Sequence, residues 1–319
     1  MNFRTELKII PFEQPIAHSD ALLSLGSCFA EGVAQRLAER KFRIVINPTG
    51  TLFNPLSILQ TLQRALRNEP YHREELSQHL NDEAYFLYEL PTRFTSNDPD
   101  EVLRRANEAQ QQLCEGFRQA NHLLITFGTA WTYRRISTGK LVANCHKQPA
   151  QLFQRERLTT EQIVAPWRDF VEQYPDKQFI FTVSPIRHLG DGLPGNAVSK
   201  ATLRLACEEL TERCANGCYF PAFEALTDDL RDYRFYADDL CHPTPMAIDY
   251  ISERFLQAAM TAEGRAAAQE ALRLVHFARH EPFQPDSEAY RAAAKRIIAQ
   301  MEASNCDFSD EIARIESRL

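Results

Sequence analysis

The sequence predicts an α/β protein built as a three-layer α/β/α sandwich around a parallel β-sheet. Two observations predict this fold class. Continuous apolar runs of strand length, such as Leu123–Phe127 and Phe179–Val183, are typical of strands that are buried on both faces of a sheet. Helical stretches separate these runs, and strands that alternate with such helices imply right-handed βαβ crossovers. A chain of 319 residues is long enough to build one large core of this kind.

Each expected element follows from its local pattern. Phe29, Val33 and Leu37 repeat at helical spacing after the first apolar run, which predicts a strand followed by a helix. The expected strands are Ala21–Leu25, Phe42–Ile46, His122–Thr126, Phe179–Val183 and Cys218–Phe220. The expected helices are Phe29–Lys41, Pro55–Arg67, Pro99–Ala120, Thr160–Gln173, Ser199–Ala215 and Pro245–Thr261. Residues Tyr71–Ser96 do not fit the alternation and are expected to form a hairpin or a lid.

The end of the chain differs from the rest in composition. We expect one domain over residues 1–262 and a helical extension over residues 263–319, which is rich in Ala, Arg and Glu. Two helices are expected in it, at Gly264–Ala278 and Ser287–Glu302. Such an extension packs on the core or forms an oligomer interface. The pattern does not separate these readings, so the oligomeric state stays open.

The charge balance argues against two classes of partner. The chain carries 36 Lys and Arg against 43 Asp and Glu, a net charge of −7, whereas proteins that bind the nucleic acid backbone usually present a basic face. No polybasic run is present to attract an anionic membrane surface. The first residues lack the apolar segment of a signal peptide, and no apolar run is long enough to span a membrane. We therefore expect a cytoplasmic protein that binds neither nucleic acid nor membranes.

The cysteine pattern favours free thiols over a metal site. The eight cysteines are Cys28, Cys114, Cys145, Cys207, Cys214, Cys218, Cys241 and Cys306. Without a secretory signal they are expected to be reduced. The adjacent pairs Cys145–His146 and Cys241–His242 raise zinc as an alternative, but no CxxC pair accompanies them. We expect no metal and no other cofactor.

Polar clusters follow four of the expected strands. They read Gly26-Ser27-Cys28, Asn-Pro-Thr-Gly at 47–50, Gly-Thr-Ala-Trp at 128–131 and Ser-Pro-Ile-Arg-His at 184–188. In a doubly wound sheet, ligands bind beyond the carboxyl ends of the strands. We therefore expect the site in the crevice that these clusters line. Lys200 is expected to be a surface charge at a helix start close to this crevice.

Ser27 is the expected nucleophile. A serine on the turn between a strand and a helix exposes its hydroxyl, and its backbone N–H at the helix start stabilises an oxyanion. A serine hydroxyl is a weak nucleophile, so it needs a base that a third group orients. Asp239 and His242 lie three apart in a loop, which lets the carboxylate meet the imidazole Nδ1 while Nε2 faces Ser27. The alternatives are a serine that only caps the helix and an incidental histidine.

The order of these features resembles that of the SGNH hydrolases, which have a nucleophile turn near the N-terminus and an Asp-x-x-His before the last core helix. More specifically, the chain resembles the GSCFA family, because residues 25–30 read Leu-Gly-Ser-Cys-Phe-Ala. Further blocks similar to that family lie at residues 47–55, 127–131, 144–149, 184–188 and 237–243. A match at six ordered blocks is more specific than any single motif.

The resemblance implies an esterase-type site on a flavodoxin-like sheet. Ser27 is then the nucleophile, His242 the general base and Asp239 the carboxylate that orients it. One departure lies in the nucleophile block itself, where residues 26–28 read Gly-Ser-Cys in place of Gly-Asp-Ser.

The expected oxyanion hole departs from the SGNH pattern as well. That pattern takes donors from the N–H of the nucleophile, which is Ser27 in this reading, from a glycine after the second strand and from an asparagine after the third. Gly50 matches the glycine, but the third-strand block has no asparagine. Thr129 and Asn144 both stay open as substitutes. Losing one such donor can cost about 3 kcal/mol of transition-state stabilisation.

Four residues near the expected crevice are candidates for substrate binding. Trp131 stacks on a sugar ring or is a partly buried residue at the rim. Arg187 and His188 bind a carboxylate or a sugar, or form structural ion pairs. His146 is a site residue or a loop histidine.

The expected function is the hydrolysis of an acyl ester of a small molecule or carbohydrate, including O-acetyl groups. Three alternatives stay open. Acyl transfer uses the same triad with a sugar hydroxyl in place of water. A catalytically weak carbohydrate-binding module is compatible with the missing asparagine, and an interaction scaffold would use the C-terminal extension.

Overall fold

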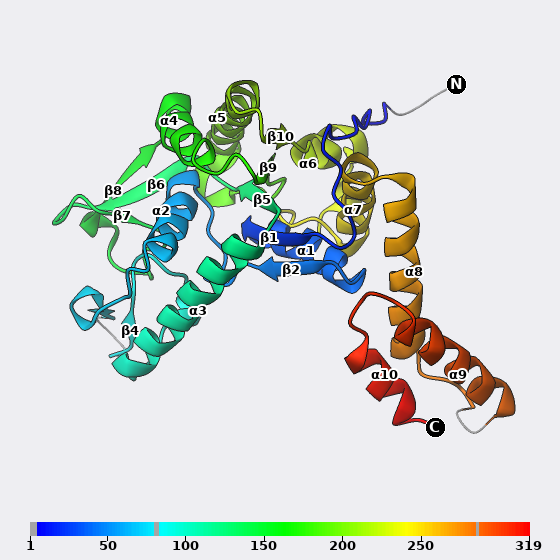
Figure 1. Cartoon of the computed structure of the whole chain (residues 1–319). Coiled ribbons are helices and arrows are strands. Elements are labelled where there is room, and N and C mark those ends of the chain that lie inside the picture. The colour runs from blue at the N-terminus through cyan, green and yellow to red at the C-terminus, as the bar shows by residue number, and fades with distance from the viewer. Residues whose placement is uncertain (1–4, 80–82, 285–286) are drawn as a thin grey trace.

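The computed structural model describes residues 5–79, 83–284 and 287–319. Its centre is a five-stranded parallel sheet in the order β10-β9-β5-β1-β2 (Figure 1). The strands are β1 (Ala21–Gly26), β2 (Arg43–Ile46), β5 (His122–Phe127), β9 (Gln178–Val183) and β10 (Gly217–Tyr219). The predicted strands are confirmed within one residue at each end, and their order is that of a flavodoxin-like sheet.

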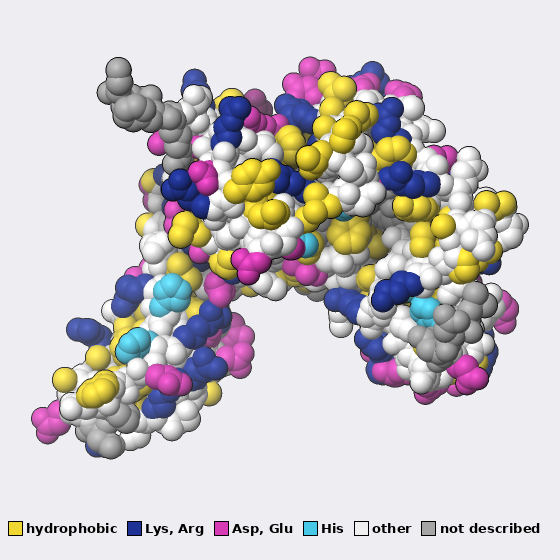
Figure 2. All heavy atoms as spheres, turned by 180° about the vertical axis from the view of Figure 1, so that it is seen from behind, with side chains coloured by type: hydrophobic (Ala, Val, Ile, Leu, Met, Phe, Trp, Pro, Cys, Tyr) yellow, Lys and Arg dark blue, Asp and Glu magenta, His cyan; other side chains and the backbone are white. Residues whose placement is uncertain are grey.

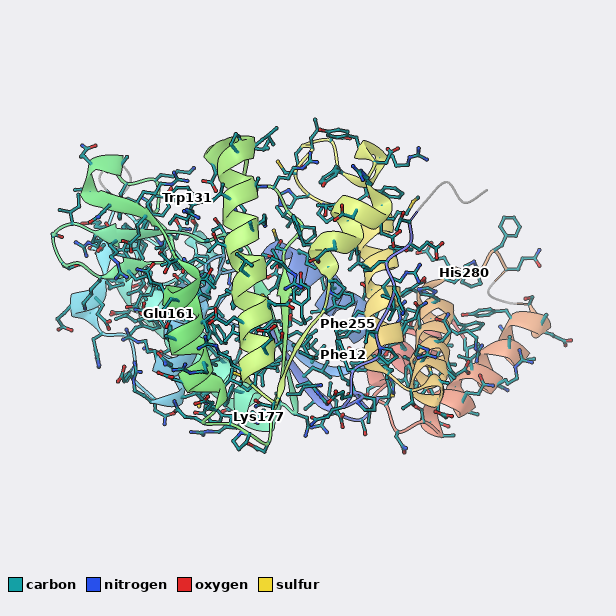
Figure 3. The ribbon with its side chains drawn as sticks, turned by 90° about the horizontal axis from the view of Figure 1, so that it is seen from above. Phe12, Trp131, Glu161, Lys177, Phe255 and His280 are labelled. Atoms are coloured by element: carbon teal, nitrogen blue, oxygen red, sulfur yellow. The ribbon has the colours of Figure 1, made fainter. Side chains whose placement is uncertain are left out.

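Helices cover both faces of the sheet, which confirms the three-layer α/β/α sandwich. One face carries α2 (Pro55–Leu66), α3 (Pro99–Gln119), α4 (Thr160–Val171) and α5 (Gly192–Arg213). The other carries α1 (Cys28–Glu39), α7 (Pro245–Ala259) and the short α6 (Ala222–Glu224). Trp167 packs between Phe127 and Phe181 on the first face, at ring distances of 5.4 and 5.7 Å. On the second, Phe12 meets Phe255 edge to face (Figure 3).

Helix α5 begins seven residues before the predicted start at Ser199. Its first turns contain Gly192, Pro194 and Gly195, which are poor helix formers and argue against a helix in the sequence. A proline in the first turn is tolerated, because the N–H that it lacks has no helical partner there. The earlier start brings α5 up to the carboxyl edge of the sheet.

A second, antiparallel sheet was not predicted. It consists of β6 (Trp131–Arg135), β7 (Leu141–Val142) and β8 (Phe153–Arg157) in the order β7-β6-β8. Charged residues interrupt β6 and β8, so neither is an apolar run. The predicted hairpin at Tyr71–Ser96 is present as β3 (Ser77–Gln78) paired with β4 (Tyr85–Phe86). Residues 80–82 lie outside the described residues, and the lid reading is untested.

The C-terminal extension forms its own small helical cluster. It consists of α8 (Ala262–Arg279), α9 (Glu288–Glu302) and an unpredicted α10 (Ser309–Glu316). Leu274, Ile297 and Met301 are buried within it. Ion pairs of Arg279 with Glu39 and of Lys41 with Glu311 join it to the end of α1. Figures 1 and 2 show it standing away from the sheet, with charged side chains of both signs on its surface.

No described helix combines the length and the apolarity that crossing a membrane requires.

Candidate active site

The turn between β1 and α1 is fixed by backbone geometry. Gly26 has a φ of 137°, and a Cβ on it would lie 2.2 Å from the Thr126 carbonyl oxygen, so only glycine fits. The buried Asn47 side chain holds this turn from the end of β2. Its Oδ1 accepts the Gly26 N–H at 2.9 Å, and its Nδ2 donates to the Gly26 carbonyl at 3.2 Å. Sequence reasoning gave Asn47 no role, although a polar residue directly after a strand was a signal.

Ser27 does not face the base that was predicted for it. Its side chain is 1% exposed, makes no capping bond to α1, and its Oγ has no hydrogen-bond partner among the described residues. The group opposite the imidazole is the next side chain. Cys28 Sγ lies 3.4 Å from His242 Nε2. The expected Ser27–His242 contact is therefore replaced by a Cys28–His242 contact.

The position of Cys28 explains this correction. Counted from Gly26, Cys28 stands at the place of the serine in the Gly-Asp-Ser pattern, and Ser27 at that of the aspartate. Ser27 is the N-cap of α1, with an extended ψ of 172°, and Cys28 is the first helical residue. The two side chains differ in environment: that of Ser27 is buried, whereas that of Cys28 is partly exposed and contacts His242.

Asp239 and His242 are brought together by the tight loop that precedes α7. Asp239 Oδ2 lies 2.5 Å from His242 Nδ1, and its Oδ1 accepts the backbone N–H groups of Cys241 and His242, each at 2.9 Å. These bonds, with that of the His242 N–H first, lower the pKa of Asp239 to about 2. The carboxylate is therefore ionised over the whole neutral range and fixes the orientation of the ring.

Arg187 braces this loop through its guanidinium. Its guanidinium stacks on the Tyr236 ring at 4.1 Å, and its Nη1 donates to the Leu240 carbonyl at 3.4 Å. Leu240 has a left-handed φ of 57°, which is rare for leucine and makes the turn tight. Two roles were predicted for Arg187, substrate binding and a structural ion pair. The structure shows a structural role, which Arg187 fills by stacking on tyrosine rings and donating to a carbonyl.

The environment of the Cys28 thiol contains opposing influences. Burial raises its pKa, and the nearby carboxylates Glu31 and Asp239 raise it further. Its own backbone N–H and that of Phe29 lower it, because both donate toward the sulfur at the start of α1. Burial and the two carboxylates thus favour the neutral thiol, whereas the two N–H groups at the helix start favour the thiolate.

The predicted oxyanion donors are engaged in local structure. The Gly50 N–H donates to the Asn47 carbonyl at 2.7 Å, and its φ of 83° and close approach to Pro91 explain the glycine. Its N–H is thus already paired, which contradicts the assigned role. Gly50 instead closes the turn that lies next to Gly26.

The two candidates for the missing asparagine are engaged as well. Thr129 Oγ1 lies 3.1 Å from Ser199 Oγ and accepts the Trp131 N–H. Asn144 Oδ1 accepts the His146 N–H at 2.7 Å, and its Nδ2 donates to Thr92 Oγ1. Neither side chain contacts Cys28 or Ser27 in these bonds, so the expected convergence of donors on Ser27 is not what the structure has.

His146 lies in the core and not in the site. It is 2% exposed, its Nε2 bonds the carbonyls of Leu87 and Leu90 at 3.0 and 2.9 Å, and its ring stacks on Phe86. Burial lowers its pKa to about 4. This corrects its assignment to substrate binding: the ring holds the β3–β4 segment in place.

His188 and Trp131, the remaining candidates for substrate binding, are both partly exposed. His188 is half-buried against Phe53, and burial, followed by the charges of Lys200 and His242, lowers its pKa to about 4, so the ring is neutral at pH 7. One face of the half-buried Trp131 ring is covered by the Arg155 guanidinium at 3.8 Å. A substrate ring could stack only on the other face. Both assignments to substrate binding stay predictions.

No group of three His, Cys, Asp or Glu side chains within the described ranges is placed to hold a metal ion.

No curated protein matches the chain. The model of the GSCFA family matches residues 21–255, which include Cys28 and the whole Asp239–His242 loop. The chain therefore belongs to the GSCFA family.

Proposed function

We propose that the protein is a cysteine-dependent acyl hydrolase that cleaves an ester through a thioester intermediate. The observation that carries this proposal is the chain of contacts from Cys28 Sγ to His242 Nε2 and from His242 Nδ1 to Asp239 Oδ2, at 3.4 and 2.5 Å. A nucleophile beside a base, with the base oriented by a carboxylate, is the arrangement that acyl transfer needs.

The proposed reaction has two steps. His242 takes the thiol proton, the thiolate attacks the acyl carbonyl, and the alcohol leaves with that proton as the thioester forms. A water molecule then gives its proton to His242, attacks the thioester and releases the acid, and the proton returns to Cys28. The N–H groups of Cys28 and Phe29 at the start of α1 donate toward the thiol sulfur, and in this proposal they also stabilise the oxyanion in both steps.

The surroundings fit this chemistry. The side chains of Asp239 and His242 are each 49% exposed, so water and a sizeable alcohol group reach them directly. All eight cysteines are free thiols, which fits the cytoplasmic location predicted from the sequence. We therefore keep acyl esters of small molecules and carbohydrates, including O-acetyl sugars, as the proposed substrates.

The test is to trap the acyl-enzyme. The protein is mixed with an aryl acetate or an acetylated sugar, quenched in acid and digested, and the peptides are weighed. We expect one acetyl group on Cys28, its loss in Cys28→Ala, and its retention in Ser27→Ala and in the neighbouring-thiol control Cys241→Ala. An acetyl group on Ser27 would restore the serine mechanism.

Product analysis separates the alternatives. Release of acetate supports hydrolysis, whereas an acetylated acceptor formed in the presence of free sugar supports acyl transfer by the same residues. If neither Cys28 nor Ser27 is acylated by any ester of the panel, the binding-module alternative replaces the enzyme.

A further inference from the structure

Asn47 is the residue at which the chain leaves β2. Its N–H continues the pairing of β2 with β1 by one more bond, to the Ser24 carbonyl at 2.9 Å. Its φ of 39° is left-handed, a conformation that asparagine tolerates better than most residues. The main chain therefore turns away from β1 here, before the pairing of the two strands reaches Gly26.

The Asn47 side chain takes over where the main chain turns away. Its carboxamide bonds both the N–H and the carbonyl of Gly26, at 2.9 and 3.2 Å, which are the two groups that a neighbouring strand would otherwise bond. Its Nδ2 also lies 3.3 Å from Glu31 Oε1, in the first turn of α1. One side chain, 1% exposed, thus joins residues that flank Cys28 on both sides in the sequence.

Asn47 is itself held from outside the sheet. Its carbonyl accepts the Gly50 N–H at 2.7 Å and the Arg93 Nη2 at 3.0 Å. Arg93 lies in the short helix Thr92–Phe94, which follows β4. The carboxamide therefore has a fixed position, which a side chain needs if it is to fix another residue in turn.

Lys200 makes a different connection at the same edge of the sheet. The sequence predicted a surface charge, but Lys200 is 2% exposed, and its Nζ donates to the carbonyls of Gly128 and Ser184, each at 2.6 Å. These two residues directly follow β5 and β9, and neither belongs to the turn between β1 and α1. Of the two connections, that of Asn47 is the one that reaches the turn carrying the thiol.

We propose that Asn47 is a positioning residue for Cys28, because its carboxamide fixes Gly26 and thereby holds Cys28 Sγ against His242 Nε2. The proposal rests on the proposed function of Cys28 as nucleophile. Gly26 has the widest conformational freedom of any residue type, so the turn needs support from a neighbour. The thiol and the imidazole are 214 positions apart in the sequence and lie 3.4 Å from each other, so a displacement of about 1 Å at this turn disrupts their contact.

The test is the rate of Cys28 alkylation by iodoacetamide at neutral pH, followed on the Cys28 peptide. Asn47→Gly removes the carboxamide, and glycine adopts the left-handed φ without strain. We expect alkylation to slow about ten-fold in Asn47→Gly and in His242→Ala, because the thiolate is the reacting form. The double variant should be no slower than either single one, since both substitutions remove the same contact. Alkylation of Asn47→Gly at the wild-type rate or faster, or losses that multiply in the double variant, overturns the proposal.

Asn216→Ala is the matched control. The Asn216 Nδ2 also makes two hydrogen bonds to backbone carbonyls, those of Tyr174 and Lys177 at 3.0 and 2.9 Å. Asn216 directly precedes β10 and so lies at the amino end of the sheet. Its substitution should keep the wild-type rate of Cys28 alkylation, and thermal unfolding compares the stability that the two variants lose. Equal slowing in the control would assign the effect to lost stability and reject positioning by Asn47.

Asn47→Asp covers the case in which the glycine variant does not fold. Aspartate keeps the shape and the acceptor for the Gly26 N–H, but it places a carboxylate against the Gly26 carbonyl and Glu31, where Nδ2 donated. We expect the same slowing of alkylation, and a wild-type rate rejects the proposal.

Ester kinetics separate this proposal from the proposed function. On an ester that the wild type hydrolyses, Asn47→Gly should lower kcat about 10²-fold and keep KM within about three-fold, because a displaced nucleophile affects the chemical step. Alkylation does not depend on ester turnover. A protein that hydrolyses no ester therefore fails the proposed function, while alkylation still decides whether Asn47 positions Cys28.

Discussion

A histidine–aspartate pair lies at each end of the central sheet. At the amino end, His122 opens β5, with Nε2 2.8 Å from Asp20 Oδ2 and Nδ1 2.8 Å from Gln178 Oε1. At the carboxyl end, His242 contacts Asp239 with one nitrogen and the Cys28 thiol with the other. His122 is 7% exposed, whereas half of the His242 side chain is exposed.

The difference separates a structural pair from the pair that we propose to be reactive. Both nitrogens of His122 are occupied by partners that do not give up a proton during a reaction, so this ring joins β5, β9 and the N-terminal segment. The second nitrogen of His242 meets an acidic group that becomes a nucleophile when it loses its proton. The residue types alone do not distinguish the two ends; the third partner and the access of solvent do.

The largest expected effect is the loss of the third partner at the carboxyl end. Cys28→Ala should lower kcat for ester hydrolysis by roughly 10⁴-fold or more, because no other described side chain opposite His242 replaces the thiol. The measurement is steady-state hydrolysis of an aryl acetate. Activity within ten-fold of wild type would show that the Cys28 site at the carboxyl end of the sheet does not carry out the hydrolysis.

The two aspartates give the next effect and test the comparison directly. Asp239→Asn should lower kcat about 10²- to 10⁴-fold while the protein stays folded, because the carboxylate fixes the ring and stabilises the imidazolium. Asp20→Asn should leave kcat within about two-fold but cost about 1 to 2 kcal/mol of unfolding free energy. Asp238→Asn, beside Asp239, is the control for loop charge. If all three substitutions lower kcat equally, the two histidine–aspartate pairs do not differ in their contribution to hydrolysis.

Acid should weaken the carboxyl end through His188. Its folded-state pKa of about 4 lies below the ordinary value. As the pH falls from about 6.5 to 4, the unfolded chain binds a proton that the folded chain does not, so stability decreases in that window and not above it. Allowing for partial exposure, the loss is about 1 to 2 kcal/mol.

Urea unfolding at pH 7 and at pH 4.5 measures this effect. His188→Gln keeps a polar side chain without the titration, so it should make the pH dependence less steep and leave the part that comes from His146, whose pKa burial also lowers to about 4. The exposed His72→Gln is the control and should not. An equally steep loss in the His188 variant would assign the acid sensitivity to other groups.

The sequence predicted the strands and most helices of the molecule better than the contacts of its candidate site. Strands such as Phe179–Val183 are recognisable because burial on both faces selects apolar residues throughout. The roles of Thr129 and Gly50 depend on partners such as Ser199, 70 residues from Thr129, and on Pro91. Such long-range contacts leave no local pattern, so the places of Thr129 and Gly50 in the structure could not be predicted.

The predicted contact between Ser27 and His242 failed for a different reason. Both residues lie on the predicted turn, and both can act as nucleophiles. Which one faces His242 depends on the backbone angles at the N-cap, which bring the first helical residue against the imidazole. The polarity and spacing of residues in the sequence do not predict those backbone angles. Only the shift by one position relative to the Gly-Asp-Ser pattern indicated it.

The smallest expected effect lies next to the nucleophile. Ser27 Oγ is buried without a described partner, so its desolvation is not offset by a hydrogen bond. Ser27→Ala should therefore keep kcat within a few-fold and change the unfolding free energy by less than about 1 kcal/mol in either direction.

Ser57 is the matched control, because this buried serine at the start of α2 accepts a hydrogen bond from Asn54 Nδ2 at 2.8 Å. Ser57→Ala should cost about 1 kcal/mol, since Asn54 loses that acceptor. Thermal unfolding and ester hydrolysis on both variants decide the point: if Ser27→Ala loses as much stability as Ser57→Ala, the Ser27 hydroxyl has a partner, and if it loses activity like Cys28→Ala, Ser27 belongs to the catalytic group.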